Sequence, residues 1–299
     1  MRKEQKTIFL SVSFVLLQDL LYGFGDPISK LAYDRLPVFS LLCIRFWIAA
    51  AVLLALFGKK TVRQLRRCHW RALLPPCLCI AGTYLLNNLA ISMTAATSVA
   101  FLRSMSIVIT PLMALVFLRK KYSWKHLPVL AVVLLGLYLL CGFGGLSAFG
   151  KGEVLTLLAS ALMAGALVFA GSAMEEVSAT TLTTVQSLSS ALLATVVTFA
   201  AEGGVHLENA TVEVWLIIVY LAILCTLAGY LLQNLALRSL SAGTVSLLQC
   251  ACPVMTALFS YFILREHLTA AGVGGAALIV IGVAAETLLS RREETAGFS

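Results

Sequence analysis

The chain has 299 residues, of which 60% are apolar and 12% are charged, and it carries a formal net charge of +8 with a mean hydropathy of +0.94. Soluble domains are about 45–50% apolar and about 25% charged, so a soluble core could not bury this much apolar surface. The composition therefore excludes a soluble globular domain and predicts an all-α integral membrane protein.

A helix that crosses the membrane needs about 20 mainly apolar residues. Ten such stretches follow one another, at residues 7–31, 38–57, 72–92, 96–118, 127–144, 152–171, 181–201, 212–232, 244–264 and 269–290. Little sequence remains between them, so we expect ten transmembrane helices and no soluble domain. The first stretch is long and lacks a small-residue cleavage site, so we expect it to remain as a membrane anchor.

The distribution of Lys and Arg predicts the orientation. With the N-terminus inside, 16 Lys and Arg residues fall in cytoplasmic segments and three, Arg35, Lys151 and Arg265, fall outside. Because cytoplasmic loops carry an excess of positive charge, both termini should be cytoplasmic, in a multi-pass protein of the cytoplasmic membrane. The basic charge then faces anionic lipid, and we expect no nucleic-acid partner.

One segment of the chain is repeated. YLLNNLAI at 84–91 matches YLLQNLAL at 230–237, 146 positions later, and ten of the 25 residues in 84–108 are identical to those in 230–254. Five spans per half is an odd number, so the second half must enter the membrane from the opposite side. We therefore expect two inverted five-helix repeats, residues 1–148 and 149–299, with a binding site between them.

The first span is unusually polar. The run QDLLYGFGDPISK, residues 18–30, contains Asp19, Asp26 and Lys30 together with two glycines and a proline. Ionisable residues inside a span are functional candidates, and a broken helix at membrane depth is tolerated only beside protein or water. We expect a broken helix that lines a cavity; the alternative is a kinked helix whose Lys30 reaches the outer membrane surface.

Two further pairs of spans carry polar stripes. Tyr84, Asn87 and Asn88 share one face of the third span, and their repeat equivalents in the eighth span are Tyr230, Gln233 and Asn234. In the fourth span Arg103 shares a face with Ser106 and Thr110, and the repeat equivalent of Arg103 is Gln249. These residues either line the site or serve as hydrogen-bonding contacts between helices. A charge at membrane depth is costly, so Arg103 should pair with Asp19 or Asp26, or face water.

Several kinds of site are not expected. The eight cysteines include CxC pairs at 77–79 and 250–252, but residues i and i+2 of a helix point to different sides and the spans contain no histidine. We therefore expect no metal site, and we expect no cofactor. The phosphate-binding pattern GxxxxGK[ST] does not occur, which argues against ATP-driven pumping by this chain alone.

The ordered motifs resemble the drug/metabolite transporter superfamily of the EamA type. YGFGDPISK at 22–30 is similar to that family's first-span pattern, Arg45-Phe46 to the start of its second span, and 95–112 and 252–266 to its fourth and ninth spans. Two places depart from the pattern. Small or apolar residues are usual where this chain has Asp26-Pro27, and a Glu is usual where it has Lys120. The resemblance implies ten helices in two repeats and the export or exchange of small metabolites, commonly amino acids.

Two rival functions are weighed against transport. GFGD at 23–26 matches the GxGD pattern of intramembrane aspartyl proteases, but the first span alone contains Asp, so two helices cannot supply the two carboxylates. A receptor or scaffold would leave the duplication and the polar stripes unexplained.

We therefore predict a secondary transporter, not an enzyme, that moves a small metabolite by alternating access as an exporter or exchanger. The site would lie between the first, third, fourth, sixth, eighth and ninth spans, with proton or cation coupling through Asp19 or Asp26. Its partners would be a small-molecule substrate and the lipid bilayer, in a monomer or weak homodimer. The candidate substrate-binding residues are Asp19, Asp26, Lys30, Tyr84, Asn87, Asn88, Arg103, Tyr230, Gln233, Asn234 and Gln249.

Overall fold

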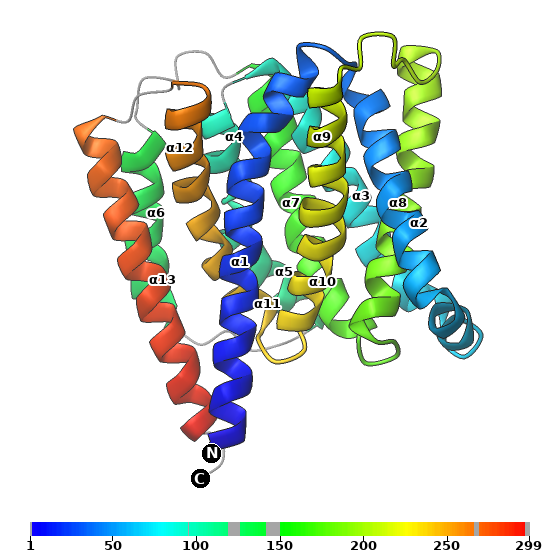
Figure 1. Ribbon diagram of the computed structural model, residues 1–299. Coiled ribbons are helices and arrows are strands. Elements are labelled where there is room, and N and C mark those ends of the chain that lie inside the picture. The colour runs from blue at the N-terminus through cyan, green and yellow to red at the C-terminus, as the bar shows by residue number, and fades with distance from the viewer. Residues whose placement is uncertain (1, 95, 119–125, 142–149, 266–268, 297–299) are drawn as a thin grey trace.

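A computed structural model describes the chain except for residues 1, 95, 119–125, 142–149, 266–268 and 297–299. The described residues form a bundle of helices joined by short turns, without strands (Figure 1). In the first half these are α1 (Arg2–Tyr33), α2 (Val38–Leu65), α3 (Trp70–Met93), α4 (Ala96–Arg103), α5 (Ser106–Leu118) and α6 (Leu127–Cys141). In the second half they are α7 (Lys151–Ala173), α8 (Ala179–Glu202), α9 (Val212–Tyr220), the π-helix η3 (Leu221–Ala228), α10 (Gly229–Ala236), α11 (Ala242–Leu248), the 3₁₀ turn η4 (Gln249–Ala251), α12 (Cys252–Ile263) and α13 (Ala270–Ala296).

Eight segments of the bundle are long and apolar enough to cross a membrane. They are Lys6–Tyr33, Val38–Leu65, Trp70–Met93, Lys151–Ala173, Ala179–Glu202, Val212–Ala236, Ala242–Ile263 and Ala270–Leu289. Two shorter apolar helices, Ser106–Phe117 and Leu127–Leu139, lie within the fourth and fifth predicted spans. The all-helical membrane class is confirmed, and the count of ten spans stays a prediction. The departure from the family pattern at Lys120 lies outside the described residues.

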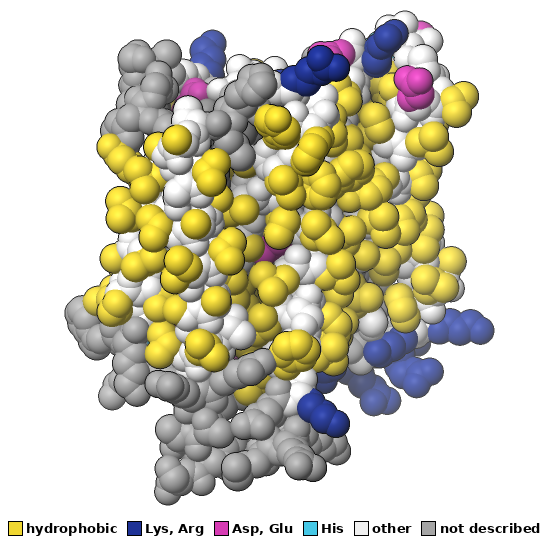
Figure 2. Space-filling view, turned by 60° about the vertical axis from the view of Figure 1, so that its left-hand side comes forward, with side chains coloured by type: hydrophobic (Ala, Val, Ile, Leu, Met, Phe, Trp, Pro, Cys, Tyr) yellow, Lys and Arg dark blue, Asp and Glu magenta, His cyan; other side chains and the backbone are white. Residues whose placement is uncertain are grey.

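The outer surface of the bundle is apolar around its middle. Phe199, Leu216 and Phe262 are 60%, 67% and 69% exposed, and many other large apolar side chains share this exposure. Figure 2 shows a broad apolar band between two ends that carry the charged side chains. A soluble monomer rarely exposes a continuous apolar surface of this size, so the band is the surface that faces lipid.

The start of α1 and the end of α13 lie at the same end of the bundle, and the connection between α2 and α3 lies at that end too (Figure 1). The largest group of basic residues in the sequence, within residues 58–71, spans the end of α2, this connection and the start of α3. The structure therefore brings the termini and the most basic loop to one side, which is the side that the charge count assigns to the cytoplasm.

The expected break in the first helix is wrong, because α1 continues from Arg2 to Tyr33 with Pro27 inside it. Its glycines instead permit close packing. A Cβ on Gly23 would lie 2.9 Å from the backbone nitrogen of Thr256 in α12, and a Cβ on Gly25 would lie 2.7 Å from Cys225 Sγ in η3. The small residues thus let α1 contact the second half of the chain at short range.

The helix breaks occur instead in the fourth and ninth spans, at positions that are equivalent in the two repeats. Turn residues Ser104 and Met105 separate α4 from α5, and the 3₁₀ turn η4 separates α11 from α12. An offset of 146 carries the start of α4 onto the start of α11 and the start of α5 onto the start of α12. Each repeat therefore has one interrupted span, and Arg103 and Gln249 occupy equivalent places beside the two interruptions.

The N-terminus of α2 is capped from another helix. Pro37 offers no side-chain cap, but Glu202 at the end of α8 accepts hydrogen bonds from the backbone N–H groups of Phe39 (2.9 Å) and Ser40 (2.8 Å). It also accepts one from Ser40 Oγ (2.7 Å). A carboxylate at this position satisfies free N–H groups and interacts favourably with the helix dipole.

Removal of this carboxylate should lower stability. We expect Glu202→Ala to reduce the free energy of unfolding by about 1–2 kcal/mol, the size of a lost helix cap. The measurement is the melting temperature of purified protein in detergent. Glu175→Ala is the matched control, since Glu175 is exposed and its side chain makes no hydrogen bond described here. Equal melting temperatures for the two variants would show that the cap does not contribute.

Candidate functional site

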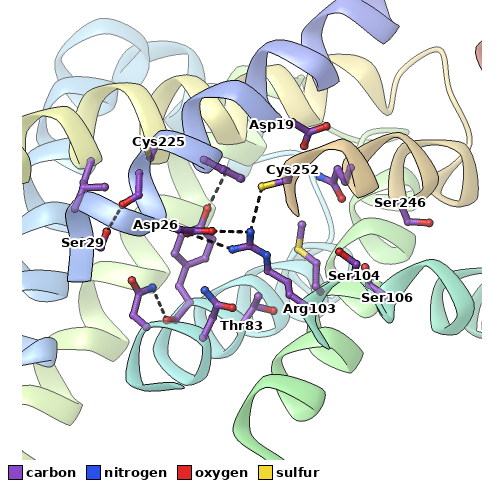
Figure 3. Close-up of a pocket in the computed structure, with 18 of the residues that line it drawn as sticks. Asp19, Asp26, Ser29, Thr83, Arg103, Ser104, Ser106, Cys225, Ser246 and Cys252 are labelled. Carbon is purple, nitrogen blue, oxygen red and sulfur yellow. Dashed lines mark hydrogen bonds and ion pairs between the residues drawn. The ribbon is translucent and has the colours of Figure 1, made fainter. Parts of the chain in front are cut away.

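A cavity lies inside the bundle where the two halves meet, with about 60 Å³ open to the centres of water molecules. A single buried water needs about 10–15 Å³ on this measure, so the cavity has room for several waters or a small solute. Figure 3 shows side chains from both halves directed into it. The residues that line the cavity are Asp19, Tyr22, Gly25, Asp26, Ser29, Arg45, Thr83, Tyr84, Asn87, Asn88, Arg103, Ser104, Ser106, Met163, Leu221, Cys225, Ser246, Gln249 and Cys252.

These residues belong to the six predicted spans and to one more. The first, third, fourth, sixth, eighth and ninth spans all contribute, and α2 of the second span contributes Arg45. The contribution of the second span was not expected.

An ion pair between Asp26 and Arg103 crosses the cavity. Arg103 Nη2 donates to Asp26 Oδ2 (2.8 Å) and Nη1 to Oδ1 (3.4 Å), which is a two-point contact between guanidinium and carboxylate. The side chains are 17% and 13% exposed. Arg103 Nη2 also donates to Cys252 Sγ (3.2 Å), and Thr256 Oγ1 donates to Asp26 Oδ2 (3.3 Å). The pair thus joins α1, α4 and α12 (Figure 3).

This pairing resolves two alternatives that the sequence leaves open. Of the two carboxylates considered for Arg103, Asp26 is the one that binds it. Lys30, one turn from Asp26 on α1, is half-buried, does not line the cavity and forms no described ion pair with Asp26. The partner of Asp26 is therefore not the lysine of its own helix, because the guanidinium of α4 reaches the carboxylate instead.

Asp19 is the second carboxylate of the cavity wall and does not take part in that ion pair. Its side chain is 1% exposed and lines the cavity, and neither carboxylate oxygen has a hydrogen-bond partner among the described residues. The titratable groups that face it are Arg103, Cys250 and Cys252, from three other elements. An unpaired carboxyl at this depth is expensive to bury as an ion unless a ligand or cation joins it.

The polar stripe of the third span faces the cavity. Tyr84, Asn87 and Asn88 all line it. Tyr84 donates its hydroxyl to Tyr22 Oη (2.8 Å), and Tyr33 donates its hydroxyl to Asn88 Oδ1 (2.5 Å). These contacts fix the side chains on the wall but leave Asn87 Oδ1 without a partner among the described residues.

The repeat equivalents in the eighth span take a different role. Tyr230, Gln233 and Asn234 do not line the cavity and are almost fully buried. Asn234 Nδ2 donates to Thr183 Oγ1 (2.9 Å) and Gln186 Oε1 (2.7 Å), both on α8. These residues connect helices, which is the alternative that the sequence left open for the amide stripes.

Gln233 belongs to a small amide network. Its Oε1 accepts from Gln18 Nε2 (3.0 Å) and from Gln249 Nε2 (3.0 Å), so it connects α10 to α1 and to η4. Gln249 is the network member that also lines the cavity. Tyr230 contacts its repeat mate Tyr84 edge to face, with ring centroids 5.2 Å apart, so the two halves meet through equivalent residues.

Sequence reasoning missed Arg45 as a site residue. It is 3% exposed, lines the cavity and donates from Nε to Thr226 Oγ1 (2.7 Å) in η3. The signal was available, since Arg45 is the one charged residue within the predicted span 38–57. The π-helix η3 was not foreseen, and it supplies Leu221 and Cys225 to the cavity wall as well as Thr226 to Arg45. Such π segments often occur at functional sites.

The geometry does not assemble a protease dyad among the described residues. Asp26 is held by Arg103, while Asp34 is exposed at the end of α1 and Asp19 is two turns away on the same helix. Aspartyl catalysis needs two carboxylates that share one proton, and this arrangement does not provide them.

The ion pair predicts a coupled response to mutation. Loss of one partner leaves a buried charge uncompensated, which costs about 3–5 kcal/mol. We expect Arg103→Gln and Asp26→Asn each to lower the melting temperature markedly, and the double variant to recover most of the loss. The double variant tests the pairing itself, since additive losses in melting temperature would show that the two charges do not stabilise each other.

The comparisons with known proteins agree with this architecture. The EamA-like transporter family matches residues 9–142 and again residues 150–286. A solved crystal structure, described only as that of a protein, superposes with a TM-score of 0.77 at 18% sequence identity, over 95% of this chain and 98% of the other. That likeness shows the fold. No curated protein matches the chain. Because the family matches both halves, over nearly the whole sequence, the chain belongs to the EamA-like transporter family.

Proposed function

We propose that the protein is a secondary carrier that moves a small organic solute across the cytoplasmic membrane by alternating access, as an exporter or exchanger. Membership of the family supports a membrane transporter of small solutes, in a family that is generally not enzymatic. The proposal adds the mechanism and the direction. The candidate residues that face the solute are those of the cavity wall, Asp19, Asp26, Tyr84, Asn87, Asn88, Arg103 and Gln249.

The observation that carries the proposal is the position of the cavity. Polar and charged side chains from both halves enclose it in the interior of a bundle whose outer surface is apolar. Carriers built of inverted repeats bind their substrates between the repeats, where interrupted helices supply polar groups at membrane depth. The interruptions beside Arg103 and Gln249 fit that arrangement. A scaffold has no need of an enclosed polar cavity, and a receptor would leave the duplication of the chain unexplained.

The topology belongs to the same proposal. Ten spans, cytoplasmic termini and an outward loop at 202–211 are consistent with eight long helices, two shorter ones and the basic loop on the side of the termini. The apolar surface in Figure 2 binds lipid. We propose a monomer or weak homodimer, since both halves of the site come from one chain.

Cysteine labelling tests the orientation. On a background without other cysteines, we expect Leu65→Cys to react with an impermeant maleimide only after the cells are opened, because the loop 58–71 is the most basic segment. Glu208→Cys should react from outside intact cells. Labelling of position 65 in intact cells would contradict the positive-inside assignment and the inverted repeat derived from it.

Coupling to a proton or cation would act through Asp19 rather than Asp26. Asp26 is engaged by two nitrogens of Arg103, whereas both oxygens of Asp19 lack partners among the described residues. A carboxyl that couples transport must bind and release a proton or cation in each cycle. A carboxylate that is held by a guanidinium is not available for this exchange. Asp19 also lines the cavity, so a charge on it acts on any solute held there.

Proteoliposomes that contain a pH-sensitive dye test this coupling. We expect addition of a transported member of an amino-acid and organic-acid panel to change the internal pH with wild type. Asp19→Asn should abolish that change while solute exchange continues. Glu213→Gln is the matched control, because Glu213 is an exposed carboxylate outside the cavity. If wild type moves solute without any pH change, and an imposed sodium gradient is equally without effect, the protein is an uncoupled exchanger.

A further inference from the structure

Arg45 differs from the other charged residues of the cavity in its surroundings. It lies near the start of α2 with 3% of its surface exposed, and its Nε is held by Thr226. Among the described residues no carboxylate forms an ion pair with it. The titratable groups that face it are neutral in character, namely Tyr33, Tyr84, Tyr230 and Cys225.

The guanidinium of Arg45 has aromatic neighbours, and its terminal nitrogens carry no hydrogen bond to the described residues. The guanidinium carbon lies 5.2 Å from the ring centroid of Tyr84 and 5.8 Å from that of Phe46, and the two rings are neighbours of each other. The hydrogen bond to Thr226 occupies Nε. The terminal Nη groups are not engaged in any hydrogen bond described here, and the residue contributes to the cavity wall. A ligand can therefore approach Arg45 through these terminal donors.

Two of the charged side chains in the cavity, Arg45 and Asp19, form no ion pair among the described residues. Four charged side chains line the wall, and Asp26 and Arg103 neutralise each other. Removal of an arginine from water is unfavourable unless an anion or several hydrogen bonds compensate it. The described part of the chain supplies Arg45 with one hydrogen bond and two neighbouring rings, so the counter-ion is left for the ligand to bring.

We propose that Arg45 is the anion-binding residue of the cavity and that it takes the carboxylate of a small organic acid through its Nη groups. A guanidinium edge matches a planar carboxylate in a two-point contact, and the terminal nitrogens of Arg45 are the donors that such a contact needs. This inference rests on the proposed function, since it treats the cavity as the solute site. Arg45 fits this role better than Arg103, because the Nη groups of Arg103 already donate to Asp26.

The test compares acids with their amides. Purified wild type, Arg45→Gln, Arg45→Lys and Thr226→Val are titrated with acetate, lactate and benzoate, each beside its primary amide, and with inorganic phosphate. Binding is read from the ligand-dependent shift of the melting temperature. Thr226→Val is the matched control, because it removes the same hydrogen bond while keeping the guanidinium.

We expect wild type to bind at least one acid more tightly than its amide, and Arg45→Gln to lose tenfold or more of the affinity for that acid with little change for the amide. Arg45→Lys should bind the acid at an intermediate affinity, since it keeps the charge without the planar edge. Thr226→Val should keep the preference for the acid. The control for folding is the melting temperature of each variant without ligand. If Arg45→Gln melts close to Thr226→Val, its loss of affinity is not caused by unfolding.

Three results would overturn the proposal: no acid preference in wild type, the same preference in Arg45→Gln, or binding that depends on Arg45 for phosphate but for none of the acids. Transport is scored separately in proteoliposomes. Vesicles that move the amides but not the acids overturn the role of Arg45 and leave the carrier function standing. Vesicles that move nothing, with a protein that binds acids through Arg45, overturn the carrier function and leave the binding site standing.

Discussion

The ion pair between Asp26 and Arg103 is the contact on which the rest of the cavity depends. It joins α1 to the end of α4 and, through Cys252 and Thr256, to α12 in the other half. A charge buried at this depth requires a partner, so the pair fixes the relative positions of three helices. Of the four charged side chains of the cavity wall, Asp19 and Arg45 are then the two that form no ion pair among the described residues.

The two halves have similar backbones but unequal chemistry. The interruption between α4 and α5 recurs between α11 and α12 at the same repeat offset, and Tyr84 meets Tyr230 across the interface. Yet all four charged residues of the cavity come from the first half, while the second half supplies Gln249, Ser246, Cys225 and Cys252. The duplicated backbone places the cavity between the halves, and the divergence of their side chains leaves its charges in the first half alone.

Close packing explains residues that look like helix breakers. Gly23 and Gly25 lie where α1 touches α12 and η3, and a side chain at either position would collide with its neighbour. Their smallness brings Asp26 within reach of Arg103 and Thr256. The same glycines together with Asp26 form the GFGD sequence that resembles a protease motif, so that motif has a packing explanation in this structure.

The sequence by itself determined the membrane class, the helical fold, the position of most helices and the relation between the halves, because apolar length and a repeated segment are properties of the chain alone. It also found seven of the cavity residues, since an amide or charge inside a span is visible without a structure. Only the tertiary structure decided which polar faces line the cavity. Helical periodicity places Asn88 and Asn234 on equivalent faces, but the neighbour that each face meets depends on how helices pack: Asn88 meets the cavity, and Asn234 meets α8. The choice of Asp26 as the partner of Arg103, the exclusion of Lys30 and the inclusion of Arg45 follow from the same cause, because each depends on distances between helices that no local pattern contains.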